Sequence, residues 1–270
     1  MRRVLTAAVL LPLLWAAVKL APAPVFVAVA MALIVVAAGE CYTLAQSGGG
    51  RPFTWLGLAA MLAVAWSFAD MTPRYGVELP LVAVTVLTGI VAMARRKDAR
   101  EMAISWVHTL FPVLFVGLTL AYTVRLRVLP GDDGQDLLLL LFGTVIASDT
   151  VAYYAGTRWG RRRLAPRLSP KKSWEGAVAG VLAGLVVGLI AHYVFFLRLP
   201  LGHALAASGL VAVAGIVGDL AESLVKRAAG AKDSSSLLPG HGGLLDRADA
   251  ILFTAPTLYY YYVCFLEGLW

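Results

Sequence analysis

Long apolar runs separated by short polar loops make up most of the chain. Runs such as LLWAAV, LLLLLF and VLAGLVVGLIA do not alternate between apolar and polar positions, whereas the strands of a membrane β-barrel alternate over about ten residues. A helix needs about 20 consecutive apolar residues to cross a bilayer. The pattern therefore predicts about nine transmembrane helices, over residues 4–22, 24–45, 53–70, 78–94, 103–123, 136–157, 175–197, 202–225 and 248–267.

Composition supports this interpretation, because 60% of the residues are hydrophobic, against roughly 45 to 50% in soluble domains. The predicted fold class is all-α, a polytopic integral membrane bundle of helices. We expect residues 1–130 to form an N-terminal scaffold and residues 131–270 to carry a catalytic site on two loops. The glycines of GVLAGLVVG are expected to permit close helix packing. Cys41 and Cys264 both lie in apolar runs and indicate neither a disulfide framework nor a metal site.

Basic residues are distributed unequally between the two sets of loops. If the N-terminus is inside, 18 of the 23 lysines and arginines fall on one side of the membrane. Because cytoplasmic loops carry the excess of basic residues, we expect an N-inside, C-outside protein of a bacterial-type cytoplasmic (inner) membrane. Arg2 and Arg3 would also fit a cleaved signal peptide. We favour a retained first helix, because the second apolar run follows almost at once.

Two loops on the basic side hold nearly all of the unusual chemistry. One reads SDTVAYYAGTRWGRRRLAPRLSPKKSWEG, residues 148–176, and the other reads SLVKRAAGAKDSSSLLPGHGGLLDRAD, residues 223–249. Ionisable residues within membrane helices are costly and usually functional, and here they are Glu40, Asp149, His192, Asp219 and Glu222. Asp149 and Asp219 each lie near the end of an apolar run that leads into one of these loops. We therefore expect them to meet near the cytoplasmic face.

The spacing and type of the polar residues predict their chemistry. Glu222 and Lys226 lie on the same helical face as Asp219 and are expected to form an ion pair. Asp219, Asp246 and Asp249 offer hard oxygen ligands that suit Mg²⁺ better than zinc. The glycines of PGHGG would let the backbone approach phosphate oxygens, although PG alone is also a turn signal. Basic residues that could clamp a polyphosphate during phosphoryl or nucleotidyl transfer are Lys171, Lys172, Lys226, Arg227, Lys232 and Arg247.

The second loop closely resembles the signature of the phosphatidate cytidylyltransferases, the CDP-diacylglycerol synthases. It contains S-x-x-K-R, K-D, L-P-G-H-G-G and D-R-x-D in the order found in that family. SPKKSWEG, residues 169–176, is similar to the second motif of the family. The resemblance covers roughly the C-terminal half of the chain, while the first five predicted helices match only in hydropathy.

The resemblance implies an enzyme that condenses CTP with phosphatidic acid to give CDP-diacylglycerol and pyrophosphate in phospholipid biosynthesis. It implies Asp219, Asp246, Lys226 and Lys172 as catalytic residues. It further implies Mg²⁺ as cofactor, held by Asp219, Asp246, Asp249 and Asp149. Residues implied in binding CTP or phosphatidate are Lys171, Ser173, Ser223, Arg227, Lys232, Asp233, His241, Gly242, Gly243 and Arg247.

Several points are left open by the sequence. A second, monovalent or divalent, cation could share the metal site, and a homodimer is compatible with the pattern, whereas nucleic acid is not an expected partner. A secondary transporter would also place acids inside helices, but no internal repeat relates the two halves of the chain. A polyprenol kinase, or a cytidylyltransferase acting on another lipid phosphate, would combine carboxylates and basic loops in the same way. Charge spacing does not distinguish CTP from dCTP or ATP.

Overall fold

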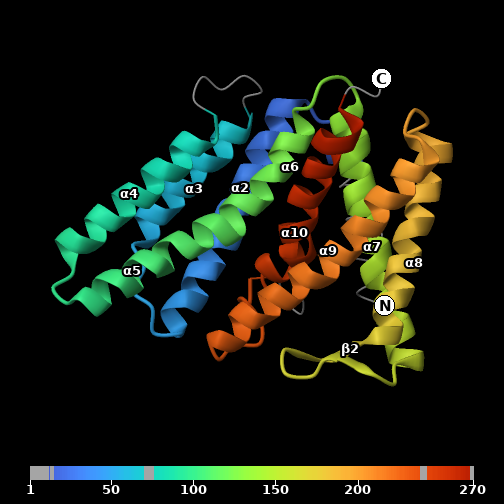
Figure 1. The fold of residues 1–270 in the computed structure, drawn as a ribbon. Helices are drawn as coiled ribbons and strands as arrows, with labels where there is room; N and C mark the ends of the chain where they lie inside the picture. The colour runs from blue at the N-terminus through green and yellow to red at the C-terminus, as the bar shows by residue number, and fades with distance from the viewer. Residues whose placement is uncertain (1–11, 13–14, 70–75, 238–241, 268–270) are drawn as a thin grey trace.

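The structure is a computed structural model that describes residues 12, 15–69, 76–237 and 242–267. Over these ranges the chain is a bundle of helices with one small β-hairpin (Figure 1). Most of the predicted helix at 4–22 lies outside the described residues, as does His241 of the second loop.

Each predicted helix from 24–45 onward corresponds to a helix of the structure. The helices are α2 (Ala23–Ser47), α3 (Thr54–Ala69), α4 (Glu78–Arg95), α5 (Ala99–Pro112), α6 (Thr119–Arg127), α7 (Asp133–Trp159), α8 (Trp174–Ile190), α9 (Leu201–Ala228) and α10 (Leu245–Tyr261). Three π-helical segments continue them, namely η1 (Val113–Leu118), which joins α5 to α6, η2 (Ala191–Phe195) after α8, and η3 (Tyr262–Leu266) after α10. Among the described residues, six helices are long and apolar enough to cross a membrane. The helical class and the presence of helices that could span a membrane are thus confirmed, while nine spans and their orientation stay predictions.

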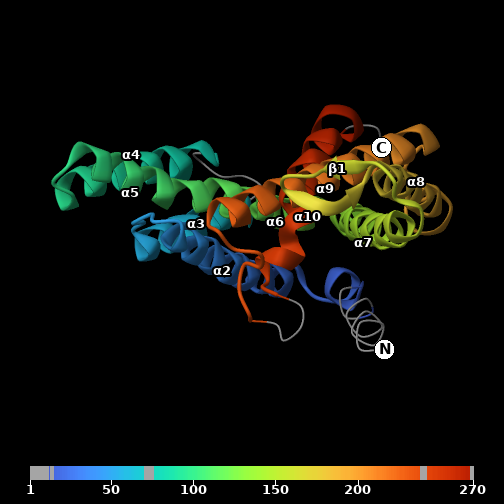
Figure 2. The ribbon, with the colours of Figure 1, turned by 90° about the horizontal axis from the view of Figure 1, so that it is seen from below.

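The helices form two groups that meet at α10. Figures 1 and 2 both show α4 and α5 at one side of the molecule and α7 and α8 at the other. Helices α2 and α6 pack against α10, which in turn packs against α9. This arrangement brings α2, from the N-terminal half, next to the start of α10, where the second loop ends.

Close packing among α7, α8 and α9 depends on the predicted glycines. A Cβ atom added at Gly184 of α8 would lie 2.8 Å from the Cβ of Ala212 on α9. One added at Gly188 would collide with the hydroxyl of Ser208, also on α9. Small residues let helix backbones approach closely in a membrane, so the predicted role of these glycines is confirmed.

The loop after α7 contains an element that the all-helical prediction did not include. Strands β1 (Arg163–Ala165) and β2 (Ser169–Ser173) pair antiparallel, with Arg163 opposite Ser173 and Ala165 opposite Ser169. The segment lacks the alternating apolar pattern that announces a strand, so the pairing could not be foreseen. β2 leads directly into α8, and the Ser173 hydroxyl caps this helix by accepting a hydrogen bond from the Gly176 N–H at 3.2 Å.

The hairpin and the connection from α9 to α10 lie at the same end of the bundle (Figure 1). We call this the hairpin end. The turns between α2 and α3 and between α4 and α5 also lie here, whereas the connections from α6 to α7 and from α8 to α9 lie at the other end. The basic loops therefore share one end, which the distribution of lysines and arginines predicts to be cytoplasmic.

Candidate active site

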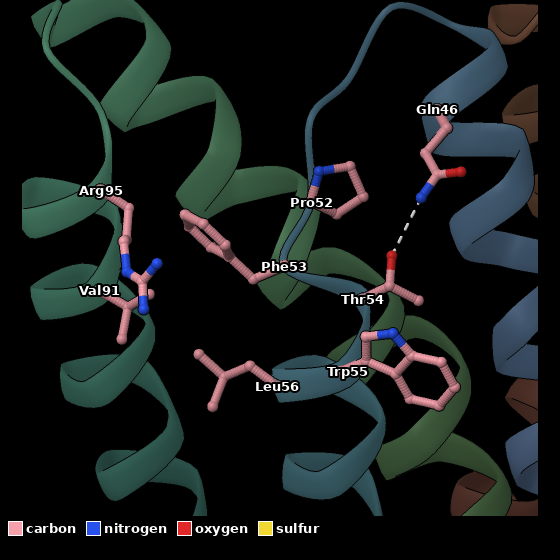
Figure 3. Close-up of a pocket in the computed structure, with 8 residues that line it drawn as sticks. All are labelled: Gln46, Pro52, Phe53, Thr54, Trp55, Leu56, Val91 and Arg95. Atoms are coloured by element: carbon pink, nitrogen blue, oxygen red, sulfur yellow. Dashed lines mark hydrogen bonds between the residues drawn. The ribbon is translucent and has the colours of Figure 1, made fainter.

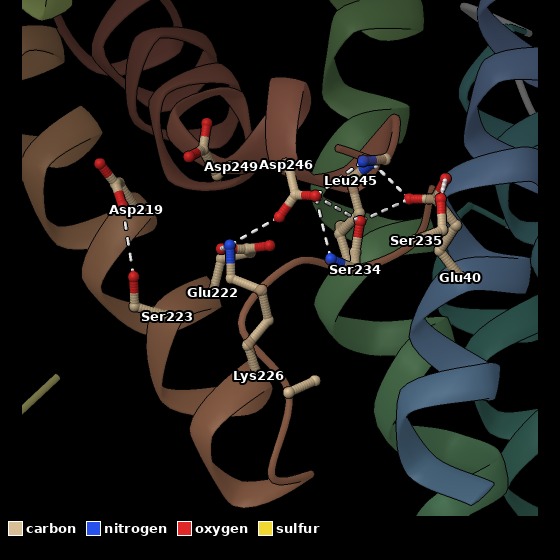
Figure 4. A network of polar contacts seen from close by, with 12 residues as sticks. Glu40, Asp219, Glu222, Ser223, Lys226, Ser234, Ser235, Leu245, Asp246 and Asp249 are labelled. Carbon is tan, nitrogen blue, oxygen red and sulfur yellow. Dashed lines mark hydrogen bonds and ion pairs between the residues drawn. The ribbon is translucent and has the colours of Figure 1, made fainter. Parts of the chain in front are cut away.

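Three aspartates from three helices come together at the hairpin end. Asp149 lies on α7, Asp219 on α9 and Asp249 on α10, and the charge of Asp219 acts on both of the others. Figure 4 shows Asp219 and Asp249 on neighbouring helices, near one another. We call these three residues the aspartate cluster. The predicted meeting of Asp149 and Asp219 is confirmed.

Two basic side chains accompany the aspartate cluster. Lys172, on β2, forms an ion pair with Asp219, and the charges of Lys172 and Arg247 both act on Asp149. The Asp149 side chain is exposed and that of Asp219 retains 28% of its accessible surface, whereas Asp249 is partly buried. Among these five described residues, three acids face two bases. The cluster thus has one more negative than positive charge when all five are ionised.

The donor chemistry of the aspartate cluster fits Mg²⁺. Its ligands are hard carboxylate oxygens, which this ion prefers. Within the described residues, no three Asp, Glu, His or Cys side chains are arranged to hold a metal ion by themselves. Mg²⁺ usually takes one or two carboxylates and completes its shell with water and substrate phosphates. The cluster therefore fits an ion that is shared with a nucleotide, rather than one enclosed by protein alone.

A second polar group lies beside the aspartate cluster and centres on Lys226. The Lys226 ammonium nitrogen lies 2.5 Å from Glu222 Oε2 and 2.6 Å from Asp246 Oδ1. Glu222 is fully buried, and a buried carboxylate is very costly unless a cation compensates it. The predicted ion pair between Glu222 and Lys226 is confirmed, and Lys226 has Asp246 as a further partner that helical spacing could not reveal.

Asp246 is held by several donors at once. Its Oδ2 accepts hydrogen bonds from the N–H and hydroxyl of Ser234, both at 2.9 Å, and from the N–H of Gly243 at 2.7 Å. Burial raises the pKa of Asp246, but the Lys226 hydrogen bond and the backbone donors of Gly243 and Ser234 outweigh it and lower the pKa to about 2. In Figure 4 this carboxylate faces Lys226 and Ser234. Its assignment as a metal ligand beside Asp219 stays a prediction.

Glu40 is the residue of this region to which the sequence analysis gave no role. It lies on α2, is 7% exposed, and accepts four hydrogen bonds from residues about 200 positions away: from the hydroxyls of Ser234 and Ser235 at 2.8 and 2.7 Å, and from the N–H groups of Leu244 and Leu245 at 2.9 and 2.8 Å. An ionisable residue within an apolar run is itself a sign of a special role, but nothing in the sequence indicated the partners of Glu40.

The described glycines of the second loop have internal packing roles. Gly242 has a positive φ of 76°, a conformation that side chains rarely tolerate. A Cβ added at Gly243 would collide with the Ser234 hydroxyl and with Glu40 Oε2. Gly243 therefore allows the loop to lie directly on Glu40. Contact between these glycines and phosphate oxygens stays a prediction.

The remaining predicted binding residues surround this centre. Arg227 donates to the carbonyl of Leu168 at 3.4 Å and to that of Ala231 at 3.0 Å, so it joins the hairpin to the end of α9. The Ser223 hydroxyl lies 3.5 Å from Asp219 Oδ1. Side chains that point into solvent, where an incoming anion could meet them, are those of Lys171, Lys232 and Asp233.

A separate cavity of about 590 Å³ lies between the end of α2, the start of α3 and α4 (Figure 3). Its lining is mostly apolar and consists of Gln46, Pro52, Phe53, Thr54, Trp55, Leu56, Val91 and Arg95. Arg95 is the charged member of these eight, and none of them is a carboxylate. The acidic chemistry of the hairpin end is therefore located elsewhere.

Comparison with known proteins agrees with the signature in the second loop. A sequence model described as the Cytidylyltransferase family matches residues 1–265. The chain belongs to this family. The resemblance noted in the C-terminal half is thereby confirmed and extends over nearly the whole chain.

Curated relatives of this cytidylyltransferase-family protein include three bacterial proteins. It is 30% identical to the phosphatidate cytidylyltransferase of Thermotoga maritima, over 88% of this chain and 87% of that protein. It is 36% identical to the phosphatidate cytidylyltransferase of Bacillus subtilis over 54% of this chain. It is 38% identical to the uncharacterized protein YnbB of Escherichia coli over 59% of this chain. In the last two cases the chain spans about half the length of the relative, 54% and 53%.

Proposed function

We propose that the protein is a membrane-embedded phosphatidate cytidylyltransferase. It would transfer CMP from CTP to phosphatidic acid, forming CDP-diacylglycerol for phospholipid biosynthesis and releasing pyrophosphate. Family membership supports cytidylyl transfer, and relatives in two bacteria carry this enzyme name. The structural observation that carries the proposal is the aspartate cluster, with Lys172 ion-paired to Asp219, at the end of the bundle that bears the basic loops.

The reaction requires positive charge and positioning more than a general base. A phosphomonoester has a second pKa near 6, so the phosphate of phosphatidic acid is already anionic at pH 7. One of its oxygens attacks the α-phosphorus of CTP. The new P–O bond forms as the bond from the α-phosphorus to the bridging oxygen breaks, and pyrophosphate leaves with that electron pair. Because both reactants are anions, the protein must hold them together and neutralise their charge.

The aspartate cluster would hold Mg²⁺ through one or two of the carboxylates of Asp219, Asp249 and Asp149, with substrate phosphates and water as the other ligands. The ion, when bound, would neutralise phosphate oxygens and orient them for in-line displacement. Lys172 is paired with Asp219. Its ammonium group therefore lies close enough to bind a phosphate that would also be coordinated by the metal ion. Asp219 would thus orient both the ion and the lysine. A second cation at this site belongs to the same proposal.

Different basic residues of the two loops would bind the two substrates. Arg227, Lys232, His241 and Arg247 would bind the triphosphate or the leaving pyrophosphate, together with Lys226. Lys171 and Lys172 would receive the phosphatidate headgroup, since both lie on β2 directly before α8. The acyl chains could remain in the bilayer while CTP enters from the cytosol. This assigns the hairpin end to the cytoplasmic face of the inner membrane.

The direct test is pyrophosphate release by detergent-purified protein supplied with CTP, Mg²⁺ and phosphatidic acid. We expect release that depends on all three components and stops with EDTA. Diacylglycerol replaces phosphatidic acid in one control, and ATP replaces CTP in another. Release with diacylglycerol, or absence of release with any lipid phosphate, would contradict the proposal. Formation of ADP from ATP with a lipid alcohol would instead identify a lipid kinase.

A further inference from the structure

Helix α10 begins without a capping side chain of its own among the described residues. The first N–H groups of a helix have no partners within the helix and form the positive end of its dipole. In this structure the N–H of Leu244 donates to Glu40 Oε1 at 2.9 Å, and that of Leu245 donates to Glu40 Oε2 at 2.8 Å. Glu40, on α2, therefore caps α10 from a distance of about 200 residues in sequence.

The same carboxylate also holds the loop that precedes α10. Glu40 Oε1 accepts a hydrogen bond from the Ser235 hydroxyl at 2.7 Å, and Oε2 accepts one from the Ser234 hydroxyl at 2.8 Å. Each carboxylate oxygen thus has two donors within hydrogen-bond distance, close to the acceptor capacity of the group. A buried carboxylate so fully engaged fixes its partners in place, because the loss of any one donor leaves part of its charge uncompensated.

Ser234 connects Glu40 to the candidate active site. Its hydroxyl lies 2.8 Å from Glu40 Oε2 and 2.9 Å from Asp246 Oδ2. One hydroxyl has a single hydrogen to donate, so Ser234 serves one of these carboxylates at a time. Asp246 in turn binds Lys226. Figure 4 shows the resulting chain of polar contacts from α2 across the loop to α9.

We propose that Glu40 is a positioning residue of the cytidylyl transfer site, an inference that rests on the proposed function. By capping α10 and holding Ser234 and Ser235, it sets the orientation of the first turns of α10, which carry Asp246 and Asp249. It touches neither substrate nor metal. The predicted N-terminal scaffold, residues 1–130, thereby takes a direct part in shaping the site.

The test replaces Glu40 by glutamine, which keeps the size of the side chain. One of its two oxygens becomes an NH₂ group that cannot accept hydrogen bonds, so the N–H of Leu244 or Leu245 loses its acceptor and the serine hydroxyl on that side must accept instead of donate. We expect kcat to fall about 10²-fold, the cost typical of a displacement of about 1 Å at an active site. The half-saturating Mg²⁺ concentration should rise, while KM for phosphatidic acid, whose predicted binding residues lie on β2, should stay unchanged.

A matched control is Glu101→Gln. Glu101 lies on α5 and is an exposed carboxylate, 2.8 Å from Arg51. Its replacement removes the same charge from the same end of the bundle without touching α10. We expect wild-type kcat and wild-type Mg²⁺ dependence in this variant. A milder variant, Ser235→Ala, removes one donor from Glu40 and should lower kcat by about fivefold, as expected for one hydrogen bond.

Amide hydrogen exchange supplies a readout that does not depend on activity. The N–H groups of Leu244 and Leu245 should exchange faster in Glu40→Gln than in the wild type, with the rest of α10 and all of α7 unchanged. Ser235→Ala should change the exchange of Leu244 in the same direction. Glu101→Gln should leave both amides as they are.

The outcomes separate the two proposals. Wild-type protein that releases no pyrophosphate overturns the proposed function and the inference with it. An active wild type together with a Glu40→Gln variant of unchanged kcat and exchange overturns the inference alone. A lower kcat with unchanged Mg²⁺ dependence and unchanged exchange at Leu244 also overturns it, because general instability then explains the loss.

Discussion

Two groups of carboxylates lie at opposite ends of α7, and they differ in burial and in charge balance. Near its start, Asp133 and Asp136 are only 6% and 5% exposed. Asp136 lies 2.6 Å from the ammonium group of Lys19, and Asp133 pairs with Arg198. We call these four residues the balanced cluster. Toward the hairpin end, Asp149 and Asp219 of the aspartate cluster are more exposed, and Lys172 and Arg247 lie near its acids.

The balanced cluster has the features of a structural ion-pair group, whereas the aspartate cluster has those of a binding site for a cation. In the balanced cluster each acid has its own cation, and both acids lie in the first turn of α7, where the helix dipole also favours negative charge. The charges of the balanced cluster are therefore compensated within the cluster. The aspartate cluster places three acids beside one another with Lys172 paired to Asp219, so additional positive charge would stabilise their ionised forms. The sequence alone does not rank these acids, because members of both groups lie within or beside apolar runs.

The largest expected effect comes from Asp219→Asn. Turnover should fall by at least about 10³-fold, because the variant loses a proposed metal ligand and the partner of Lys172 in a site that acts mainly through charge. The protein should remain folded and inserted in the membrane. Pyrophosphate release and thermal unfolding of the purified variant measure the two properties separately. Near-normal turnover would remove Asp219 from the proposed metal site.

Lys172→Ala should reduce turnover by about 10²-fold, since an ammonium group positioned for a phosphate is lost. The matched control is Lys97→Ala, which removes an exposed lysine from the turn between α4 and α5 at the same end of the bundle. That variant should stay within about twofold of the wild type. Equal losses in the two variants would mean that general surface charge, rather than the aspartate cluster, governs substrate use.

Asp136→Asn addresses the balanced cluster and should affect stability instead of turnover. We expect the free energy of unfolding to fall by about 1 to 2 kcal/mol. This is less than the loss for a fully buried ion pair, because Lys19 and Arg198 retain 25% and 39% of their side-chain accessibility and can bind water. Thermal unfolding measures the change. A variant of normal stability but lower specific activity would contradict the distinction between the two clusters.

The smallest effect is the stabilisation of the folded protein by Mg²⁺. With CTP present, Mg²⁺ at ten times its dissociation constant should add about 1.4 kcal/mol, since an ion that binds only the folded state shifts the unfolding equilibrium. The shift in melting temperature between Mg²⁺ and EDTA should be the same in the wild type and Asp136→Asn. It should disappear in Asp219→Asn. An unchanged shift in Asp219→Asn would place the ion elsewhere.

The helices and their local contacts could be predicted because short-range rules govern them. Apolar runs of sufficient length define the helices from α2 onward, and the four-residue spacing of Glu222 and Lys226 places the pair on one face. Gly184 and Gly188 lie one turn apart, so a smooth face could be expected there. Asp149 and Asp219 could be brought together in advance because each ends an apolar run on the same predicted side.

Other features depended on contacts between distant segments. The β-hairpin has no alternating pattern, and its second strand ends at Ser173, the residue that caps α8. Asp246 and Asp249 lie three residues apart, yet Asp246 binds Lys226 and Ser234 while Asp249 faces Asp219. That all four aspartates serve one metal site stays a prediction. Spacing places Asp246 and Asp249 on one face of α10, so the difference between their partners depends on the neighbouring α9 and the loop that carries Ser234.

The sequence by itself determined that this is a helical membrane protein of the cytidylyltransferase family, because apolar length and a long, ordered motif are properties of contiguous residues. Only the tertiary structure decided which carboxylates are compensated and which are exposed. It also revealed Glu40 as the cap of α10. A buried charge is identified by what surrounds it, and its surroundings come from segments about 200 residues away, beyond the reach of any local pattern.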